Sequence, residues 1–397
     1  MTRLSRKMGG VDESLTLVLS AKARRLKEAG IDVISLTAGE PDFPTPRHVK
    51  DAAIAAIESN FTRYTANEGI TELLDAVIAK FSRDNGLTFG RDQILVSSGA
   101  KHAIFNALQA ACGDGDEVII LSPYWVSYPA MVRLVDAVPV IVPTLMESGF
   151  RPIPEMIRRA ITARTKAIIL NSPTNPTGVV FTTEEVEAIA RIVRDTNILV
   201  FSDEVYEKVA FDGRRHLSIG ALDGISDRVI TVNGVSKAYA MTGWRIGYLG
   251  GPRDIVAAAA KVQGQTTSNA NSVAQKAATA ALSGSQESVD AMVTEFQRRR
   301  DISFASLSSI AGLRVFLPDG AMFFFMGVKD FLGKRHGGRT IGTSIELAHH
   351  LLDEYHVGVV PGTAFGADDC LRLSFSCPVA QLTEGLGRLK KGLEELS

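Results

Sequence analysis

The chain has 397 residues, a formal net charge of −1, 45% hydrophobic residues and 22% charged residues, which is an ordinary globular composition. This length predicts two or three domains, and the near-neutral charge gives no reason to expect nucleic acid or an anionic membrane as a partner. No stretch approaches the roughly 20 apolar residues that span a bilayer. Three cysteines without metal-ligand spacing, and an N-terminus without a signal-peptide pattern, indicate the cytoplasm.

Short apolar runs alternate with helical patterns along the chain, which is typical of an α/β fold. The first 45 residues, closed by Pro41, Pro44 and Pro46, are expected to form an arm that packs elsewhere. Helical spacing then predicts helices over residues 49–59 and 70–81. Six short β-rich runs are predicted as strands: 94–96, 117–121, 139–142, 167–170, 198–201 and 229–232.

The pattern changes near residue 290, where a long charged helix is predicted over residues 285–309. Hairpin-like strands and helices over 345–355 and 379–396 follow it. The predicted organisation is an arm with part of a small domain (residues 1–45), a large domain with a mostly parallel sheet flanked by helices (46–290), and a smaller α+β domain (291–397).

Four of the predicted strands end in distinctive residues, and ligands of open α/β sheets bind beyond the carboxyl ends of strands. After 94–96, Gly99, Ala100 and Lys101 begin a helix whose N-terminal amides favour an anion. The same segment matches the S-x-x-K of acyl-serine enzymes, but without their K-T-G or S-D-N. After 167–170, a loop over 171–178 holds two prolines, a glycine and the neutral hydrogen-bonding side chain of Asn175.

The other two strand ends carry a carboxylate and a lysine. Asp203 follows 198–201, and a buried carboxylate needs a cation or donors; a protonated pyridine nitrogen would serve, and a helix N-cap is the structural alternative. Lys237 follows 229–232 among small and apolar residues, where desolvation and the nearby Arg245 would lower its amine pKa for attack on an aldehyde. Arg245 can also hold a phosphate with its guanidinium.

Together, residues 175–178, 202–206 and 236–247 resemble the class I aminotransferase signature of fold-type I pyridoxal-phosphate (PLP) enzymes. Residues 36–43, and Arg63-Tyr64 with Gly69, resemble further segments of that family. Residues 121–129 resemble its bacterial aspartate (aspartate/prephenate) aminotransferase subgroup. The resemblance covers nearly the whole chain and implies a fold-type I architecture, with PLP in the large domain and a homodimer that shares its active sites.

The resemblance also implies residue roles. Lys237 would hold PLP as a Schiff base and carry the proton between carbons, while Asp203 would pair with the pyridine nitrogen. Further cofactor contacts would come from Gly99, Ala100, Trp125 on the ring face, Asn175, Tyr206, Ser236, Arg245 and Tyr64 of the partner subunit. Substrate contacts would come from Gly39, Lys101, Trp125, Asn175 and Arg372, the last on the α-carboxylate. Gly234 departs from the family, since many relatives have a phosphate-binding serine there.

Lys101 is the expected specificity residue, because a lysine at the matching place in the bacterial subgroup receives the distal carboxylate of acidic substrates. Ser14 and Thr16 could add hydroxyl donors there. The expected reaction is therefore ping-pong transfer between aspartate and 2-oxoglutarate, with prephenate as an alternative substrate. His102 and His216 are expected to be structural.

Three alternative functions remain. A PLP lyase or synthase would use the same Lys237 and Asp203. A non-enzymatic sensor would need a DNA-binding extension or a basic stripe, and a nucleotide-binding dehydrogenase would need G-x-G-x-x-G, which is absent.

Overall fold

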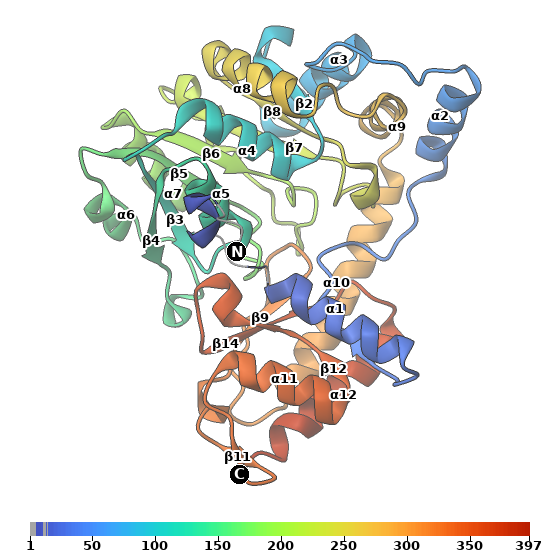
Figure 1. The fold of residues 1–397 in the computed structure, drawn as a ribbon, viewed down its shortest axis with the longest axis vertical. Coiled ribbons are helices and arrows are strands. Elements are labelled where there is room, and N and C mark those ends of the chain that lie inside the picture. The colour runs from blue at the N-terminus through green and yellow to red at the C-terminus, as the bar shows by residue number, and fades with distance from the viewer. Residues whose placement is uncertain (1–4, 11–12, 14) are drawn as a thin grey trace.

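The computed structural model describes residues 5–10, 13 and 15–397, and its centre is a seven-stranded sheet in the order β2-β8-β7-β6-β5-β3-β4 (Figure 1). Its strands are β2 (Ile94–Ser97), β3 (Glu117–Ser122), β4 (Val138–Pro143), β5 (Thr165–Asn171), β6 (Leu199–Asp203), β7 (Val229–Gly234) and β8 (Gly247–Gly250). Neighbours are parallel except around β8, which runs antiparallel to β2 and β7. The expected α/β class with a mostly parallel sheet is confirmed.

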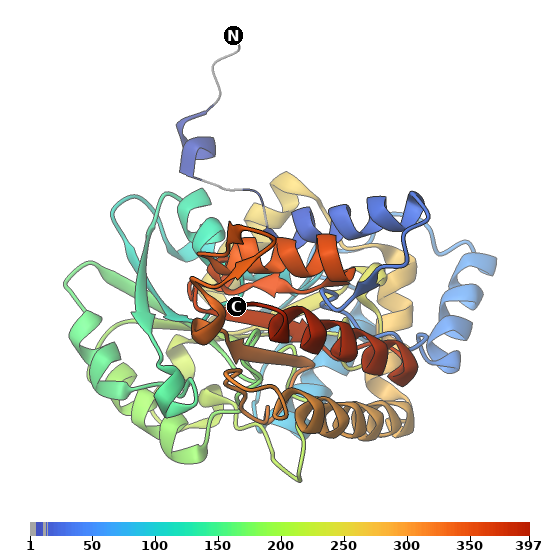
Figure 2. The same cartoon turned by 90° about the horizontal axis from the view of Figure 1, so that it is seen from below.

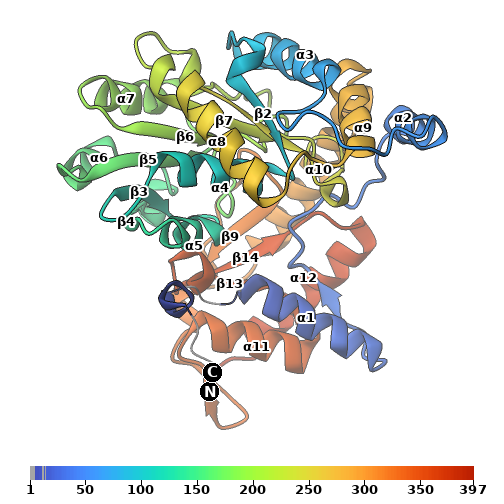
Figure 3. The ribbon, with the colours of Figure 1, turned by 45° about the horizontal axis from the view of Figure 1, so that its top comes forward.

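Helices cover both faces of this sheet because successive strand side chains point to opposite sides. Val118 and Ile120 of β3 belong to the core under α4 (Ala100–Ala111), α5 (Ser127–Leu134) and α8 (Arg253–Thr266). Ile119, between them, belongs to the core under α6 (Pro154–Ala160) and α7 (Thr183–Arg194). Figure 3 shows α4 and α8 lying across the strands.

Near β2, three further helices pack on Ile94 and Val96. They are α2 (Arg47–Glu58), α3 (Thr71–Lys80) and α9 (Ser272–Ser283), and a π-helical turn, Phe81–Asn85, extends α3. Short 3₁₀ turns complete this region and the rest of the chain: Arg6–Gly10, Arg91–Gln93, Met146–Ser148, Ile219–Ala221, Ser226–Arg228, Thr242–Trp244, Lys329–Phe331 and Gly362–Phe365.

Both ends of the chain build a second body, called here the C-terminal unit. Its antiparallel sheet is β13 (Val360–Pro361), β14 (Cys370–Ser374) and β9 (Phe323–Gly327), packed with α1 (Leu15–Glu28), α11 (Ser344–Tyr355) and α12 (Val379–Glu394). The arm joins it because β1 (Ile34–Ser35) pairs in parallel with β12 (Val357–Gly358). A small hairpin, β10 (Arg335–His336) with β11 (Arg339–Thr340), completes the unit. Figure 1 shows these elements gathered at the lower end of the molecule, which is the end that faces the viewer in Figure 2.

One long helix, α10 (Glu287–Leu307), connects the two bodies. Val289 near its start packs in the α2–α3–α9 core, whereas Met292, Phe296 and Leu307 pack in the core of the C-terminal unit. The expected break near residue 290 therefore falls in the first turn of an unbroken helix, and the boundaries at 45/46 and 290/291 stay predictions. Across the described residues, no helix has the length and apolarity to cross a bilayer.

Candidate active site

A cavity of about 580 Å³ opens between the carboxyl ends of the central strands and the C-terminal unit. Its walls come from the arm, the N-terminal ends of α4 and α5, the ends of β5 and β6, the segment after β7, and β14. The cavity brings together most of the residues expected from the sequence: Gly39, Ala100, Lys101, Trp125, Asn175, Asp203, Tyr206, Ser236, Lys237, Arg245 and Arg372.

Lys237 lies at the base of this cavity and donates a hydrogen bond from Nζ to the carbonyl oxygen of Gly39. Burial lowers the pKa of the Lys237 amine to about 8, with further lowering from Arg372 and Arg245 against the opposing effect of Glu40. An amine with this pKa is partly neutral near pH 8, so it can act as a nucleophile or a base.

Asp203 ends β6 with its carboxylate buried, and burial raises its pKa to about 6. Tyr128 Oη donates to Asp203 Oδ2 at 2.7 Å, and the Val205 amide donates to Oδ1 at 3.3 Å; both lower that pKa. Sequence reasoning missed the role of Tyr128. No local pattern marked this role, although the Tyr128 ring meets the Trp125 ring edge to face at 5.3 Å.

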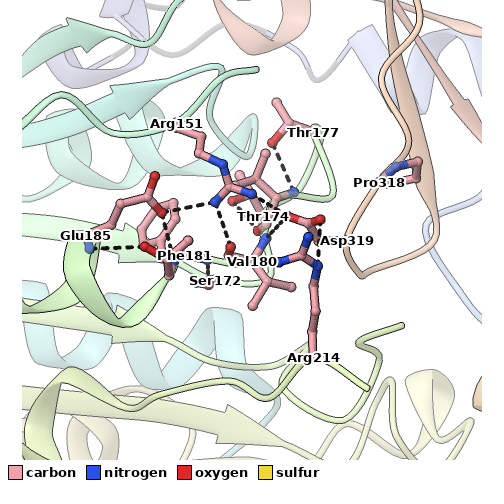
Figure 4. A network of polar contacts seen from close by, with 12 residues as sticks. Arg151, Ser172, Thr174, Thr177, Val180, Phe181, Glu185, Arg214, Pro318 and Asp319 are labelled. Atoms are coloured by element: carbon pink, nitrogen blue, oxygen red, sulfur yellow. Dashed lines mark hydrogen bonds and ion pairs between the residues drawn. The ribbon is translucent and has the colours of Figure 1, made fainter. Parts of the chain in front are cut away.

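The loop after β5 is held at both ends by polar contacts. Figure 4 shows Arg151 between Glu185 (3.0 Å) and Asp319 (2.7 Å), while Arg214 approaches the other oxygen of Asp319 at 2.9 Å. Asp319 belongs to the segment that leads into β9, so the network ties the loop to the C-terminal unit. Inside the loop, the Asn175 amide donates to Asn171 Oδ1 at 2.9 Å. Asn175 therefore projects into the cavity from a fixed backbone.

Arg372, on β14, is a buried cation that faces this loop. Its Nη1 donates to Asn175 Oδ1 at 3.0 Å and its Nη2 donates to the Thr37 carbonyl at 2.9 Å. Nε is buried without a hydrogen-bond partner, and no carboxylate of the described residues lies within ion-pair distance. Burial lowers the pKa of Arg372 to about 10. A desolvated cation of this kind is stabilised by an anionic ligand.

The N-terminus of α4 forms a cradle for a second anion. Gly99 precedes the helix with a φ of 93° and has no side chain to cap it, so the first amides remain open. A Cβ at Gly99 would lie 2.9 Å from Cζ of Arg245, and a Cβ at Gly247 would lie 2.7 Å from Cα of Ala100. Both glycines thus permit the close approach of backbone and guanidinium that an anion site needs.

Lys101, in the first turn of α4, and Trp125 both line the cavity, with Lys101 Nζ 4.9 Å from the Trp125 ring centroid. Burial, followed by the charge of Arg245, lowers the pKa of Lys101. Thr16 lines the same cavity, whereas Ser14 lies outside the described residues. Lys101 and Arg372 thus line the same cavity.

Two expectations concern residues at the margin of the cavity. Tyr64 is 91% exposed and lies outside the cavity of its own chain, so a role for it requires a second subunit. Position 234 faces Gly247 across β7 and β8, and a Cβ there would lie 3.1 Å from the Gly247 Cα. The glycine at 234 therefore fits the close strand pairing, and Ser236 remains the nearby hydroxyl that lines the cavity.

The charges on the cavity wall favour a polyanionic ligand. Four cations line it, against the two carboxylates of Asp203 and Glu40; the cations are Lys101, Lys237, Arg245 and Arg372. Glu40 accepts a hydrogen bond from Thr242 at 2.6 Å near the mouth, which leaves Asp203 as the deep carboxylate. The arrangement suits a ligand with a phosphate at Gly99, a cationic nitrogen at Asp203 and a carboxylate at Arg372.

Comparisons with known proteins agree with this geometry. The model of the family "Aminotransferase class I and II" matches residues 31–389. The chain is 42% identical to the aspartate aminotransferase of Geobacillus stearothermophilus, over 99% of both chains, and 43% identical to the aspartate/prephenate aminotransferase of Nitrosomonas europaea, over 98% of both. The crystal structure of the Rhizobium meliloti aspartate aminotransferase superimposes with a TM-score of 0.96 at 41% identity, covering 100% of both chains. That of Thermus thermophilus with maleate gives 0.92 at 42% identity, covering 99% of this chain and 100% of the other.

Proposed function

Since the chain belongs to the family of class I and II aminotransferases, we propose that it transfers the amino group of L-aspartate to 2-oxoglutarate by a ping-pong cycle, with PLP held at Lys237. The observation that carries this proposal is the buried Arg372 cation, unpaired with any described carboxylate, in the same cavity as Lys237 and Asp203. A free α-carboxylate satisfies Arg372 and brings the adjacent amino group toward Lys237.

The residues present fit PLP. The open amides of Gly99 and Ala100, with Arg245 and Ser236, suit its phosphate, and the glycine at 99 leaves the necessary space. Asp203 would face the pyridine nitrogen, because a buried carboxylate gains most from a cationic partner. Tyr206 and the Asn175 amide group suit the phenolic oxygen, and Trp125 suits the ring face.

When bound, PLP supplies an electron sink for the bonds at the substrate α-carbon. The chain's own residues do the rest. Arg372 and Asn175 orient the α-carboxylate, and Asp203 keeps a proton on the ring nitrogen. Lys237, whose amine pKa is lowered to about 8 by burial, takes and returns a proton at Nζ.

The preference for a dicarboxylic substrate rests on Lys101. Arg372 accounts for one carboxylate and Lys101 offers a cation on another wall of the same cavity. The names of the relatives support aspartate, and the maleate bound in the Thermus thermophilus structure is a dicarboxylate too. Prephenate, which also carries a second carboxylate, is the second candidate, supported by the relatives named for it.

We also propose a homodimer in the cytoplasm. Exposed apolar side chains gather on α2 and the loop after it: Ile54 is 47% exposed, Ile57 56% and Tyr64 91%. A second copy of the chain would cover them and bring the partner's Tyr64 to the phosphate. The three cysteines are free and buried, which agrees with a reducing compartment.

Replacement of Lys237 tests the chemistry. Lys237→Ala should lower the rate of amino transfer by at least about 10⁴-fold, because both the covalent attachment and the proton carrier are lost. It should also remove the visible absorption band of the PLP-loaded protein. Lys237→Arg, which keeps the charge, should behave the same way. Full turnover by either variant would refute the proposed function.

Replacement of Lys101 tests the substrate class. Lys101→Ser should lower kcat/KM for aspartate by about 10–100-fold, the loss of one charge-assisted contact, and leave alanine nearly unchanged. Single-turnover rates with aspartate, glutamate, alanine and phenylalanine measure this. An equal loss for aspartate and alanine would assign Lys101 to the fold instead. With prephenate as the amino acceptor, kcat/KM should fall in Lys101→Ser as it does for aspartate.

A further inference from the structure

A second set of charged side chains lies buried behind the end of β6, outside the cavity. It consists of Lys80, Asn85, Glu204, Glu207 and His216, and is called here the Glu204 cluster. Glu204 is fully buried and Lys80 is 2% exposed, while Asn85 and Glu207 are 7% and 9% exposed. Charged groups are almost never buried so deeply unless they are paired. None of the five lines the cavity, so none is explained by ligand contact.

Glu204 is the centre of the cluster. One of its oxygens accepts from Ser202 Oγ at 2.8 Å and Ser218 Oγ at 2.7 Å. The other accepts from Asn85 Nδ2 at 2.9 Å and lies 3.1 Å from Nε2 of His216. Three of these contacts are hydrogen bonds, whereas His216 Nε2 lies at ion-pair distance without a hydrogen bond, so Glu204 is held by groups from four separate points of the chain.

Glu207 is held by the end of α3. Lys80 Nζ forms an ion pair with Glu207 Oε1 and donates to Asn85 Oδ1 at 2.6 Å. Asn85 Nδ2 in turn donates to Glu207 Oε2 at 2.6 Å as well as to Glu204. The π-helical turn Phe81–Asn85 places Asn85 against Lys80, the last residue of α3, five residues away. Asn85 therefore bridges both carboxylates.

The cluster and the cavity share one short segment of backbone. Asp203 and Tyr206 line the cavity, whereas Glu204 and Glu207 point into the cluster. The backbone itself adds two bonds: the Glu204 amide donates to the Val232 carbonyl and the Glu207 amide donates to the Glu204 carbonyl, both at 2.9 Å. A shift of the buried carboxylates would therefore move Asp203 and Tyr206.

We propose that the Glu204 cluster positions the Asp203 carboxylate and the Tyr206 hydroxyl against the ring of the bound cofactor. Its members are positioning residues, since they act through Asp203 and Tyr206 and touch no ligand. The proposal rests on the proposed function, because it presumes that PLP is the group that Asp203 meets.

The charges of the cluster are paired, which supports its role in holding the segment in place. Burial alone would lower the pKa of His216, but the Glu204 carboxylate beside it raises that pKa overall. With His216 charged, two cations balance two carboxylates. Removal of any one member leaves a buried charge or donor without its partner, which is costly in a desolvated site.

The test compares two buried asparagines of the same body. Asn85→Ala removes the bridging amide, and Asn106→Ala removes a fully buried amide of α4 that bonds Gln263 at 3.1 Å and no member of the cluster. For each PLP-loaded variant, the PLP dissociation constant, the pH midpoint of the visible absorption band and the melting temperature of the cofactor-free protein are measured. Wild-type protein that binds no PLP would refute the proposed function and not this inference in particular.

Asn85→Ala is expected to raise the PLP dissociation constant about tenfold over Asn106→Ala at a similar melting temperature. The midpoint of the visible band should move to higher pH, because a ring nitrogen that loses its proton no longer repels a proton on the lysine-linked nitrogen. If Asn85→Ala fails to fold, Ser218→Ala, which removes one of the three hydrogen-bond donors to Glu204, should give the same shifts at smaller size. Wild-type dissociation constant and midpoint in a folded Asn85→Ala or Ser218→Ala would overturn the proposal.

Discussion

At the scale of single residues, the buried carboxylate of Asp203 suits the proposed function but lowers the stability of the cofactor-free protein at neutral pH. Burial raises its pKa from an ordinary 3.8 to about 6, against the lowering by Tyr128. The cofactor-free folded state therefore binds a proton that the unfolded state releases. The free energy of unfolding should fall as pH rises from about 4 to about 6, and remain reduced above that range.

Asp203→Asn removes this ionisation and still lets Tyr128 donate. The cofactor-free variant should gain up to about 3 kcal/mol in free energy of unfolding at pH 7 and lose the slope between pH 4 and 6. Urea unfolding across that range measures both. Asp212→Asn is the control of opposite sign, because Arg300 lowers the pKa of Asp212 by hydrogen bonding, and its loss should destabilise at neutral pH. A less stable Asp203→Asn at pH 7 would contradict the prediction.

Arg372 and Tyr128 also mark how far residue-level sequence reasoning extends. The position of Asp203 and Lys237 after strands followed from the chain pattern, since strand ends meet at one sheet edge. The family resemblance suggested Arg372, but its unpaired Nε depends on how β14 packs against Thr37 and Asn175. Tyr128 stood inside a quoted motif, yet nothing local indicated that its hydroxyl reaches a carboxylate 75 residues away.

At the scale of elements, the N-terminus of α4 is defined by Gly99. Gly99→Ala should weaken PLP binding about tenfold or more, because its Cβ displaces the Arg245 guanidinium and a φ of 93° is strained for alanine. Gly115→Ala is the matched control, since Gly115 has a φ of 83° and no atom within 4 Å of an added Cβ. Equal PLP dissociation constants for the two variants would exclude a steric role for Gly99.

The sequence predicted most strands of the central sheet but missed several short ones. The six strands with apolar β-rich runs lie within a few residues of their predicted bounds; 94–96, for example, became Ile94–Ser97. β8, Gly-Tyr-Leu-Gly, was missed because two glycines in four residues hide its pattern. β1 and β12 have two residues each, and their pairing joins distant parts of the chain, so no periodicity could indicate it. Local sequence pattern was enough to locate the strands of the large sheet. The C-terminal unit depends on pairing between distant segments, which local pattern does not indicate.

At the scale of the whole molecule, the proposed dimer can be tested by mixing two damaged chains. Tyr64→Ala should weaken PLP binding in every site, and Lys237→Ala should abolish turnover. In a mixed dimer, one cavity combines an intact Lys237 with Tyr64 of the partner subunit. Refolding the two variants together should therefore restore sites with wild-type PLP affinity, measured by turnover at limiting PLP. If Tyr64 bound PLP in the cavity of its own chain, mixing the two variants would restore no site with wild-type PLP affinity.

The pairing of the arm with the C-terminal unit also bears on how the protein is made. Thr37 and Gly39 accept bonds from Arg372 and Lys237, and the Ser374 amide donates to the Leu36 carbonyl at 2.9 Å. The arm leaves the ribosome long before β14 exists, because synthesis proceeds from the N-terminus. The wall of the cavity that holds Arg372 belongs to β14, so it forms only after the last part of the chain emerges. Substrate recognition is therefore a property of the finished chain, because a nascent chain that ends before residue 370 lacks the guanidinium that would meet the α-carboxylate.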